Sequence, residues 1–153
     1  NLLKAWKAAD TSFPFVDSHN KTYSVRDGSD WEQTLKPRLH ERLNASANVV
    51  LFLSSETKYS RALREEIDYA INTNGLPIIV VYPEIKDKVG VHTSVGFTTK
   101  VKNLWNTLPV FRDNKYKVPV LHVPNDKKLI RSALGDTDFR VATKTKATDY
   151  FYK

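Results

Sequence analysis

The stretch that decides the fold is "NVVLFLSSETKYSRALREEIDYAI", residues 48–71, where one apolar pattern gives way to another. The stretch opens with a continuous apolar run, "VVLFL" (49–53), which is typical of a parallel strand covered on both faces. From residue 60 onward, apolar side chains recur at helical spacing and share one face: Leu63, Ile67, Ala70 and Ile71. The stretch therefore predicts a buried strand that runs into an amphipathic helix.

The same alternation continues on both sides of this stretch. Strand-like runs are "FPFVDSH" (13–19), "LPIIVVYPE" (76–84) and "VPVLHVP" (118–124), where Pro119 indicates a strand start or an edge position. Helical patterns lie between them, at 1–9, about 30–45, 60–73, about 100–110 and 126–134. Strands that alternate with helices predict an α/β fold with a doubly wound parallel sheet and helices on both faces.

Three segments leave their local structure open. "SDWE" (29–32) predicts a capping box between Ser29 and Glu32, but Pro37 requires either a kink or a later helix start. Residues 85–99 show no period and are predicted to form a loop with two glycines. The closing "TKTKATDYFYK" (143–153) is open to three interpretations: a final short strand, a docked tail or a partner contact.

Composition restricts the function classes. The 153 residues predict one domain over 1–153, and 27% charged with 41% hydrophobic residues is typical of globular chains. No run approaches the ~20 apolar residues that span a bilayer, and we recognise no signal peptide, so no membrane partner and a cytoplasmic location are expected. The absence of cysteine excludes disulfides, thiolate metal sites and cysteine nucleophiles.

The net charge of +7 favours an anionic partner, which leaves nucleotide, nucleic acid and acidic protein open. Nucleic acid is the weakest of these, because the basic residues are scattered and no nucleic-acid-binding signature is present. The sequence contains no methionine, so we expect residues to be missing from it.

Glu66 is the unusual residue of the predicted helix, because its carboxylate lies on the apolar face. Glu65 and Asp68 have Arg61 and Arg64 four residues earlier as surface partners, whereas Glu66 has no such partner in its own helix. A carboxylate at the edge of a buried stripe is either a snorkelling side chain or a functional group.

The run "RLNASANVVLFLSSETKYSRALREEIDYAI" (42–71), with "FPFVDSH" before it and "LPIIVVY" after it, resembles the TIR-like domains of the Thoeris anti-phage defence proteins and their bacterial relatives. The resemblance covers about residues 1–84. It implies a flavodoxin-like sheet in which a serine-bearing strand end leads into a helix with the catalytic glutamate of NAD cleavage. The matching positions are Ser55 and Glu66, with Asp17 at the end of the preceding strand.

The resemblance implies an enzyme that cleaves NAD, releases nicotinamide and forms an ADP-ribose-type signal for an effector protein. Glu66 would be the catalytic residue, and Asp17, His19 and Ser55 would bind substrate; NAD is the substrate, so no cofactor and no metal are expected. Nicotinamide leaves as a neutral base, so one carboxylate can suffice where ordinary glycosides need two. We expect Glu66→Gln to abolish cleavage and barely change stability. Assembly into a homo-oligomer stays open.

Two alternatives remain open beside the enzyme. Ala62 stands where many TIR NADases carry tryptophan, which suits a catalytically silent TIR-like module that works by assembly. Asp17 at a strand end suits a receiver-like switch, although no acidic cluster for magnesium accompanies it. We also expect a further strand before Asn1, between the strands at 13–19 and 48–55, whose following loop forms one wall of the Glu66 pocket.

Overall fold

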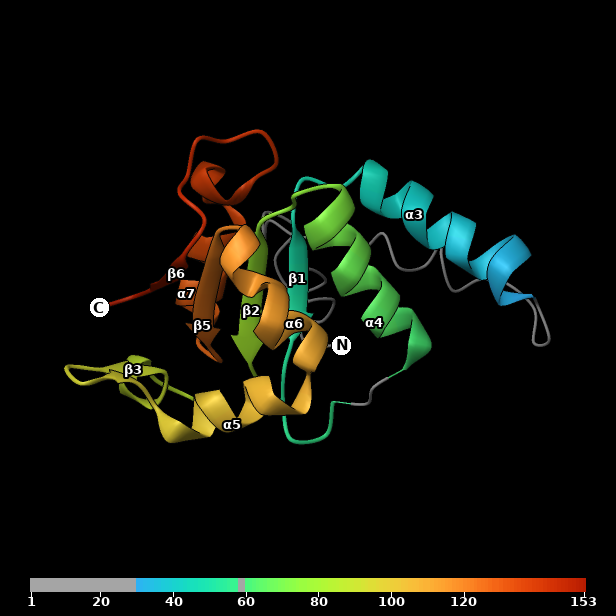
Figure 1. Ribbon diagram of the computed structural model, residues 1–153. Helices are drawn as coiled ribbons and strands as arrows, with labels where there is room; N and C mark the ends of the chain where they lie inside the picture. The colour runs from blue at the N-terminus through green and yellow to red at the C-terminus, as the bar shows by residue number, and fades with distance from the viewer. Residues whose placement is uncertain (1–29, 58–59) are drawn as a thin grey trace.

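The computed structural model describes residues 30–57 and 60–153 and has a four-stranded parallel sheet at its centre (Figure 1). The strands are β1 (Val49–Phe52), β2 (Ile78–Tyr82), β5 (Val120–Pro124) and β6 (Asp149–Phe151), in the order β1-β2-β5-β6. All three strand pairs are parallel. The predicted α/β, flavodoxin-like fold is therefore confirmed.

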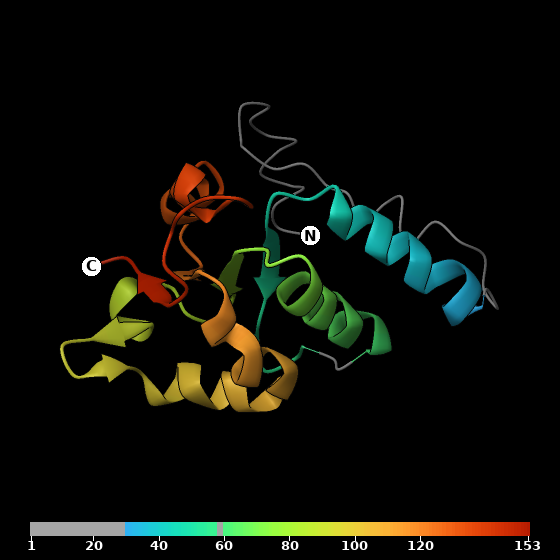
Figure 2. The same cartoon turned by 45° about the horizontal axis from the view of Figure 1, so that its top comes forward.

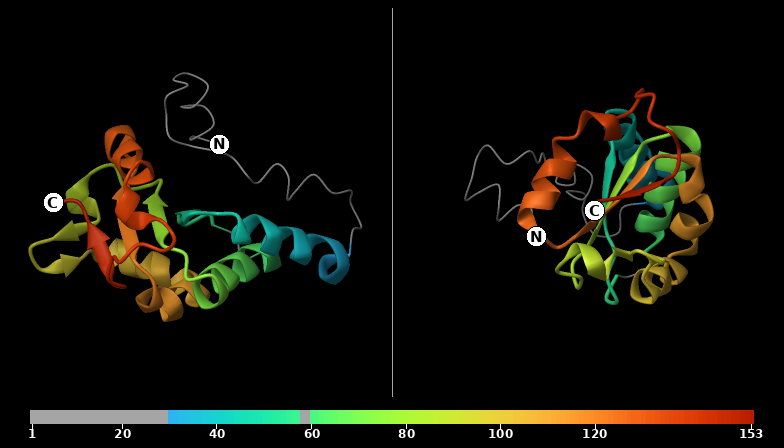
Figure 3. Two further views of the ribbon diagram at one scale, coloured as in Figure 1. Left: turned by 90° about the horizontal axis from the view of Figure 1, so that it is seen from above. Right: turned by 90° about the vertical axis from the view of Figure 1, so that its left-hand side faces the viewer.

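Helices cover both faces of this sheet, as Figure 3 shows edge-on. One face carries α4 (Arg61–Asp68), α5 (Thr99–Thr107) and α6 (Pro109–Asn114), with α3 (Lys36–Asn44) packed beside α4. The other face carries α7 (Lys127–Leu134). Two short π-helical turns, Trp31–Leu35 and Tyr69–Thr73, adjoin α3 and α4. Short 3₁₀ turns lie at Lys88–Gly90, Lys115–Lys117 and Thr137–Phe139.

The start of α3 differs from the predicted capping box. Asp30 is the cap, and its carboxylate accepts a hydrogen bond from the Glu32 backbone N–H at 3.0 Å. Ser29 lies outside the described residues. The π-helical turn leads directly into α3, and Pro37 lies at the second position of α3, where it has no N–H to donate to the preceding turn. The regular α-helix therefore begins later than the capping signal at 29–32 predicts. A later start was one of the two interpretations of Pro37.

The predicted strand-to-helix stretch is confirmed in detail. Ser60 caps α4 by accepting a hydrogen bond from the Leu63 N–H at 3.0 Å, and Ile67, Ala70 and Ile71 are buried. The helical path continues through the π-helical turn to Thr73. This face of α4 lies against the sheet and brings the second turn of α4, with Glu66, into the interior.

The segment 85–99 was predicted to be an irregular loop, and this is only partly right. It contains a small antiparallel hairpin of β3 (His92–Thr93) and β4 (Gly96–Phe97). Gly96 has φ of 120°, a conformation that favours glycine. Short strands with two residues each carry too little apolar periodicity to be recognised from the sequence.

The C-terminal stretch forms β6, which confirms the interpretation as a final short strand. β5 lies between β2 and β6, so Pro119 marks a strand start rather than an edge. The chain end lies beside the hairpin (Figure 2), where the Lys88 ammonium donates a hydrogen bond to the Lys153 carbonyl at 2.8 Å.

Residues 13–19 lie outside the described part of the chain. The expected strand before Asn1 and its place in the sheet therefore stay predictions. Among the described residues, no helix combines the length and the apolar character needed to cross a bilayer.

Candidate active site

The carboxyl ends of β1 and β2 meet at one edge of the sheet and bring Ser55 to Glu84. The Ser55 backbone N–H donates to Glu84 Oε1 at 2.7 Å, and the Ser55 hydroxyl donates to Glu84 Oε2 at 2.5 Å. These hydrogen bonds lower the pKa of Glu84, and the charge of Lys100 acts in the same direction. Ser55 is thus fixed at the edge where ligands bind in open α/β sheets.

The hydrogen bonds with Glu84 restrict which ligand groups Ser55 can bind. An ionised carboxylate within hydrogen-bond distance repels a phosphate, which disfavours a phosphate contact at Ser55. Its hydroxyl oxygen donates its proton to Glu84 and keeps acceptor capacity. A hydroxyl donor, such as a ribose hydroxyl, is therefore the better match at Ser55.

Glu66 lies inside the protein, with 5% of its surface exposed. The Arg42 Nη2 on α3 donates a hydrogen bond to Glu66 Oε1 at 2.9 Å, and both side chains are buried. The sequence-based description of Glu66 as unpaired is therefore wrong. Its partner comes from another helix, 24 positions earlier in the chain, which spacing within one helix cannot reveal.

The pair is incompletely satisfied. Across residues 30–57 and 60–153, Arg42 Nε is the buried side-chain polar atom for which the structure shows no hydrogen-bond partner. A buried donor left without a partner costs about 1–3 kcal/mol. The Arg42–Glu66 pair thus joins α3 to α4, but leaves one hydrogen-bond donor of Arg42 unsatisfied.

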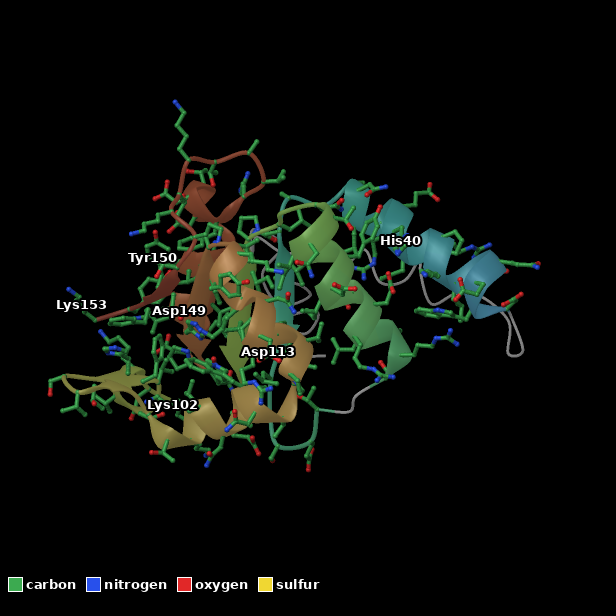
Figure 4. The ribbon with its side chains drawn as sticks, viewed as in Figure 1. His40, Lys102, Asp113, Asp149, Tyr150 and Lys153 are labelled. Carbon is green, nitrogen blue, oxygen red and sulfur yellow. The ribbon has the colours of Figure 1, made fainter. Side chains whose placement is uncertain are left out.

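A second pair joins the same two helices closer to the surface. His40 Nε2 lies 2.7 Å from Glu65 Oε2, and the His40 ring stacks on Tyr69 with 3.7 Å between ring centroids. Figure 4 shows His40 on α3, beside α4. The predicted Arg61 partner of Glu65 is replaced, since Arg61 contacts Glu32 at 3.4 Å. Glu65 and Glu66 therefore have their partners on α3 rather than within α4.

Asp17 and His19, the other two predicted substrate-binding residues, lie outside the described residues, so their roles stay predictions. Of the four predicted site residues, the structure places Ser55 with Glu84 and Glu66 with Arg42. Among the described residues, no group of three or more histidine, aspartate or glutamate side chains is arranged to hold a metal ion.

A second polar cluster, which the sequence interpretation missed, lies between the sheet and α5. We call it the His122 network; its members are Lys115, Asp149, His122, Tyr82 and Trp105. The Trp105 indole N–H donates to the Tyr82 oxygen at 2.7 Å, and that oxygen lies 2.6 Å from His122 Nδ1. His122 Nε2 lies 2.7 Å from Asp149 Oδ1, and the Lys115 ammonium donates to Asp149 Oδ2 at 2.6 Å.

The hydrogen bonds of this network share one direction if His122 is neutral. Indole can only donate, so the Tyr82 hydroxyl donates its own proton to His122 Nδ1, and Nε2–H donates to Asp149. Burial lowers the pKa of His122, against the opposing effect of Asp149, and burial raises the pKa of Tyr82. Burial of Asp149 opposes ionisation, but His122 and Lys115 outweigh it and hold the pKa of this carboxyl below its usual value.

One signal for the network was present in the sequence. A histidine in the apolar run 118–124 must find hydrogen-bond partners once the strand is buried. Its partners come from β2 and β6, and the pairing of β5 with both strands could not be read from local spacing. His122 is fully buried, so this side chain supports the fold rather than contacting a ligand directly.

The chain was also compared with known protein families. The family model described as "Thoeris protein ThsB, TIR-like domain" matches residues 1–88. The matched range includes α3, β1, α4 and β2, and with them Arg42, Ser55, Glu66 and Glu84. The hairpin, α5, α6, β5, α7 and β6 follow the matched range.

Proposed function

Because the chain belongs to the family of TIR-like domains of the Thoeris protein ThsB, we propose that it cleaves NAD with Glu66 as its catalytic carboxylate. Its family gives it a role in Thoeris anti-phage defence. The observation that carries the proposal is a carboxylate held inside the protein on the helix that follows the serine-bearing end of β1. A surface glutamate would be surrounded by water, which screens the charge that this chemistry needs.

The proposed reaction needs one negative charge at the reacting carbon. As the bond between the ribose C1′ and the nicotinamide nitrogen breaks, its electron pair goes to the nitrogen, and neutral nicotinamide leaves. Positive charge develops on C1′ and the ribose ring oxygen. The Glu66 carboxylate stabilises that charge and binds ribose hydroxyls, and its effect increases where water is excluded.

The second reactant decides the product. A water oxygen that attacks C1′ gives free ADP-ribose and releases its proton to solvent. An oxygen or nitrogen of the same nucleotide that attacks C1′ gives a cyclised product with loss of one proton. We propose that this nucleotide is a signal for an effector protein, as the resemblance implies.

Ser55 supports the same interpretation from the edge of the sheet. Its hydroxyl oxygen, oriented by Glu84, is suited to accept a hydrogen bond from a ribose hydroxyl. Asp17 and His19 complete the proposed substrate-binding set. The cytoplasmic location and a homo-oligomeric state stay predictions.

One observation favours a catalytically silent module as the second candidate. Ala62 on α4 replaces the tryptophan of many TIR NADases, and Glu66 is covered by Arg42. A silent module would bind NAD or a partner without releasing nicotinamide. The receiver-like alternative depends on Asp17, which the structure does not describe.

The test is chromatography of nicotinamide released from NAD, with extract of phage-infected cells supplied as the trigger. The parent protein, Glu66→Gln and Glu65→Gln are compared, because Glu65 is an adjacent glutamate on the same helix. Loss of the charge at Glu66 should reduce the rate by at least about 100-fold, and Glu65→Gln should keep the parent rate. Equal rates for the parent and Glu66→Gln would refute the assignment. A parent that releases no nicotinamide under these conditions would favour the silent module.

A further inference from the structure

In the structure, the Arg42–Glu66 pair closes Glu66 to substrate, an inference that rests on the proposed function. Both side chains are buried and Glu66 Oε1 already accepts a hydrogen bond from Arg42. A ribose hydroxyl would have to displace that guanidinium to reach Oε1. The described state is therefore a resting state of the site.

The charge of Arg42 also keeps Glu66 inactive, apart from the steric block at Oε1. The guanidinium beside Glu66 Oε1 brings the net charge of the pair to about zero. An oxocarbenium-like transition state that develops beside the intact pair would meet a cation as well as an anion. The carboxylate can therefore stabilise the transition state only after Arg42 has moved away.

We infer that Arg42 is a latch that masks the carboxylate of Glu66 until the enzyme is activated. The latch opens when the Arg42 side chain leaves Oε1, by rotation of the side chain or by a small shift of α3 against α4. Arg42 then acts on catalysis through Glu66 and contacts neither NAD nor the reacting atoms.

Two features limit the stability of the closed state, so that the latch can open. Within the described part of the chain, the buried Arg42 Nε has no hydrogen-bond partner, so closing leaves one donor unsatisfied. Arg42 also lies in the last turn of α3, where a cation is stabilised by the helix dipole even without Glu66. The closed and open states can thus lie close in free energy.

The test measures binding and turnover separately, in the full chain and without any trigger. The binding probe is carba-NAD, in which a methylene replaces the ring oxygen of the nicotinamide ribose, so that it is not cleaved. Arg42→Met removes the charge and keeps the aliphatic length. Arg38→Met, an exposed arginine one turn earlier on α3, is the matched control.

Arg42→Met should bind carba-NAD about 10-fold more tightly than the parent and release nicotinamide about 10-fold faster, whereas Arg38→Met should match the parent in both measurements. A parental or weaker Kd for Arg42→Met overturns the latch, because Arg42 would then support the site rather than mask it. Tighter binding by Arg42→Met without any nicotinamide release leaves the latch standing and refutes the proposed function. Circular dichroism establishes whether each variant is folded.

If Arg42→Met does not fold, Arg42→Lys decides. Lysine keeps the charge but loses the planar fork that fits a carboxylate, so the latch weakens. If Arg42 is a latch, Arg42→Lys should bind carba-NAD more tightly than the parent, but less tightly than a protein whose Glu66 is fully unmasked. A parental Kd for folded Arg42→Lys together with an unfolded Arg42→Met overturns it.

Discussion

The Arg42–Glu66 pair and the His122 network bury ionisable groups in opposite ways. In the pair, two full charges meet directly between two helices, and one guanidinium donor stays unsatisfied. In the network, the His122 imidazole and the Tyr82 phenol connect the buried strands to Asp149, which Figure 4 labels, and each polar group of the network has a hydrogen-bond partner. Incomplete satisfaction is suited to a site that opens, and complete satisfaction to a scaffold that does not.

The two regions also differ in their place in the chain. The pair lies within residues 1–88, which the ThsB family model matches, and the network includes residues from β5, β6 and α5 that follow the matched range. The first half therefore carries the proposed chemistry. The second half supplies the strands and helices that complete the sheet beside it.

The largest effect on stability is expected when the pair is broken on one side. Glu66→Leu leaves the Arg42 charge buried without its partner and should lower the free energy of unfolding by about 3–5 kcal/mol. Urea denaturation measures this loss of free energy. The double variant Arg42→Met/Glu66→Leu should recover most of that loss. If the double variant is as unstable as Glu66→Leu, the pair does not explain the effect.

Glu66→Gln should also lower the stability, in contrast to the small change expected from the sequence. Glutamine keeps a hydrogen-bond acceptor for Arg42 but lacks the negative charge of the Glu66 carboxylate. The buried Arg42 guanidinium then faces a neutral amide. The free energy of unfolding should fall by about 1–3 kcal/mol, still compatible with a folded protein for the activity test. A urea midpoint equal to that of the parent would show that the pair contributes no net charge stabilisation.

The network should give a somewhat smaller effect. His122→Phe fills the space but leaves the Tyr82 hydroxyl and Asp149 Oδ1 without their partner, at a cost of about 2–3 kcal/mol. The measurement is again urea denaturation, with nicotinamide release as the second readout. The variant should keep the NAD turnover of the parent under conditions where it is folded. Loss of turnover in a folded His122→Phe protein would contradict the separation of the two regions.

Acid should weaken the network as His122 takes up a proton. The pKa of His122 is lowered in the folded protein from 6.5, mainly by burial, so the unfolded chain binds the proton first. Stability from this group is fully present above pH 6.5 and is lost as the pH falls below it, by at most about 1.4 kcal/mol per pH unit. His122→Gln, which does not titrate, should show a flatter dependence between pH 6.5 and 5. An unchanged slope in this variant would exclude His122 as the cause.

The smallest effect is expected at the hairpin, which provides a baseline for both regions. Val95 is 94% exposed at the turn between β3 and β4. Val95→Ser should therefore change the free energy of unfolding by less than about 0.5 kcal/mol and leave NAD turnover unchanged. A larger loss in the same urea titration would show that the hairpin contributes to one of the two regions.

Features with a strong local signal could be predicted from the sequence. The apolar run at 48–53 and the helical spacing from Leu63 to Ile71 gave the strand and helix that carry Ser55 and Glu66. The residue-type pattern could also identify Glu66 as unusual. The partners of these residues could not be predicted, because Arg42 and Glu84 meet them only through the packing of α3 on α4 and of β1 beside β2.

The network was missed for the same physical reason. His122, Tyr82 and Asp149 come from three strands, and their contacts depend on the register that pairs Val80 with His122 and His122 with Phe151. The hairpin was missed because each of its strands has two residues, which is too short for an alternating pattern. Local periodicity identifies elements, whereas sites made between elements need the three-dimensional arrangement.

The most direct test of Glu66 as the catalytic carboxylate is a crystal structure of Arg42→Met with carba-NAD. We expect the Glu66 carboxylate to lie about 2.6–3.2 Å from a hydroxyl of the nicotinamide ribose, with Ser55 beside the same bound nucleotide. Nucleotide bound elsewhere, with Glu66 still buried away from the ribose, would contradict Glu66 as the group that meets the substrate.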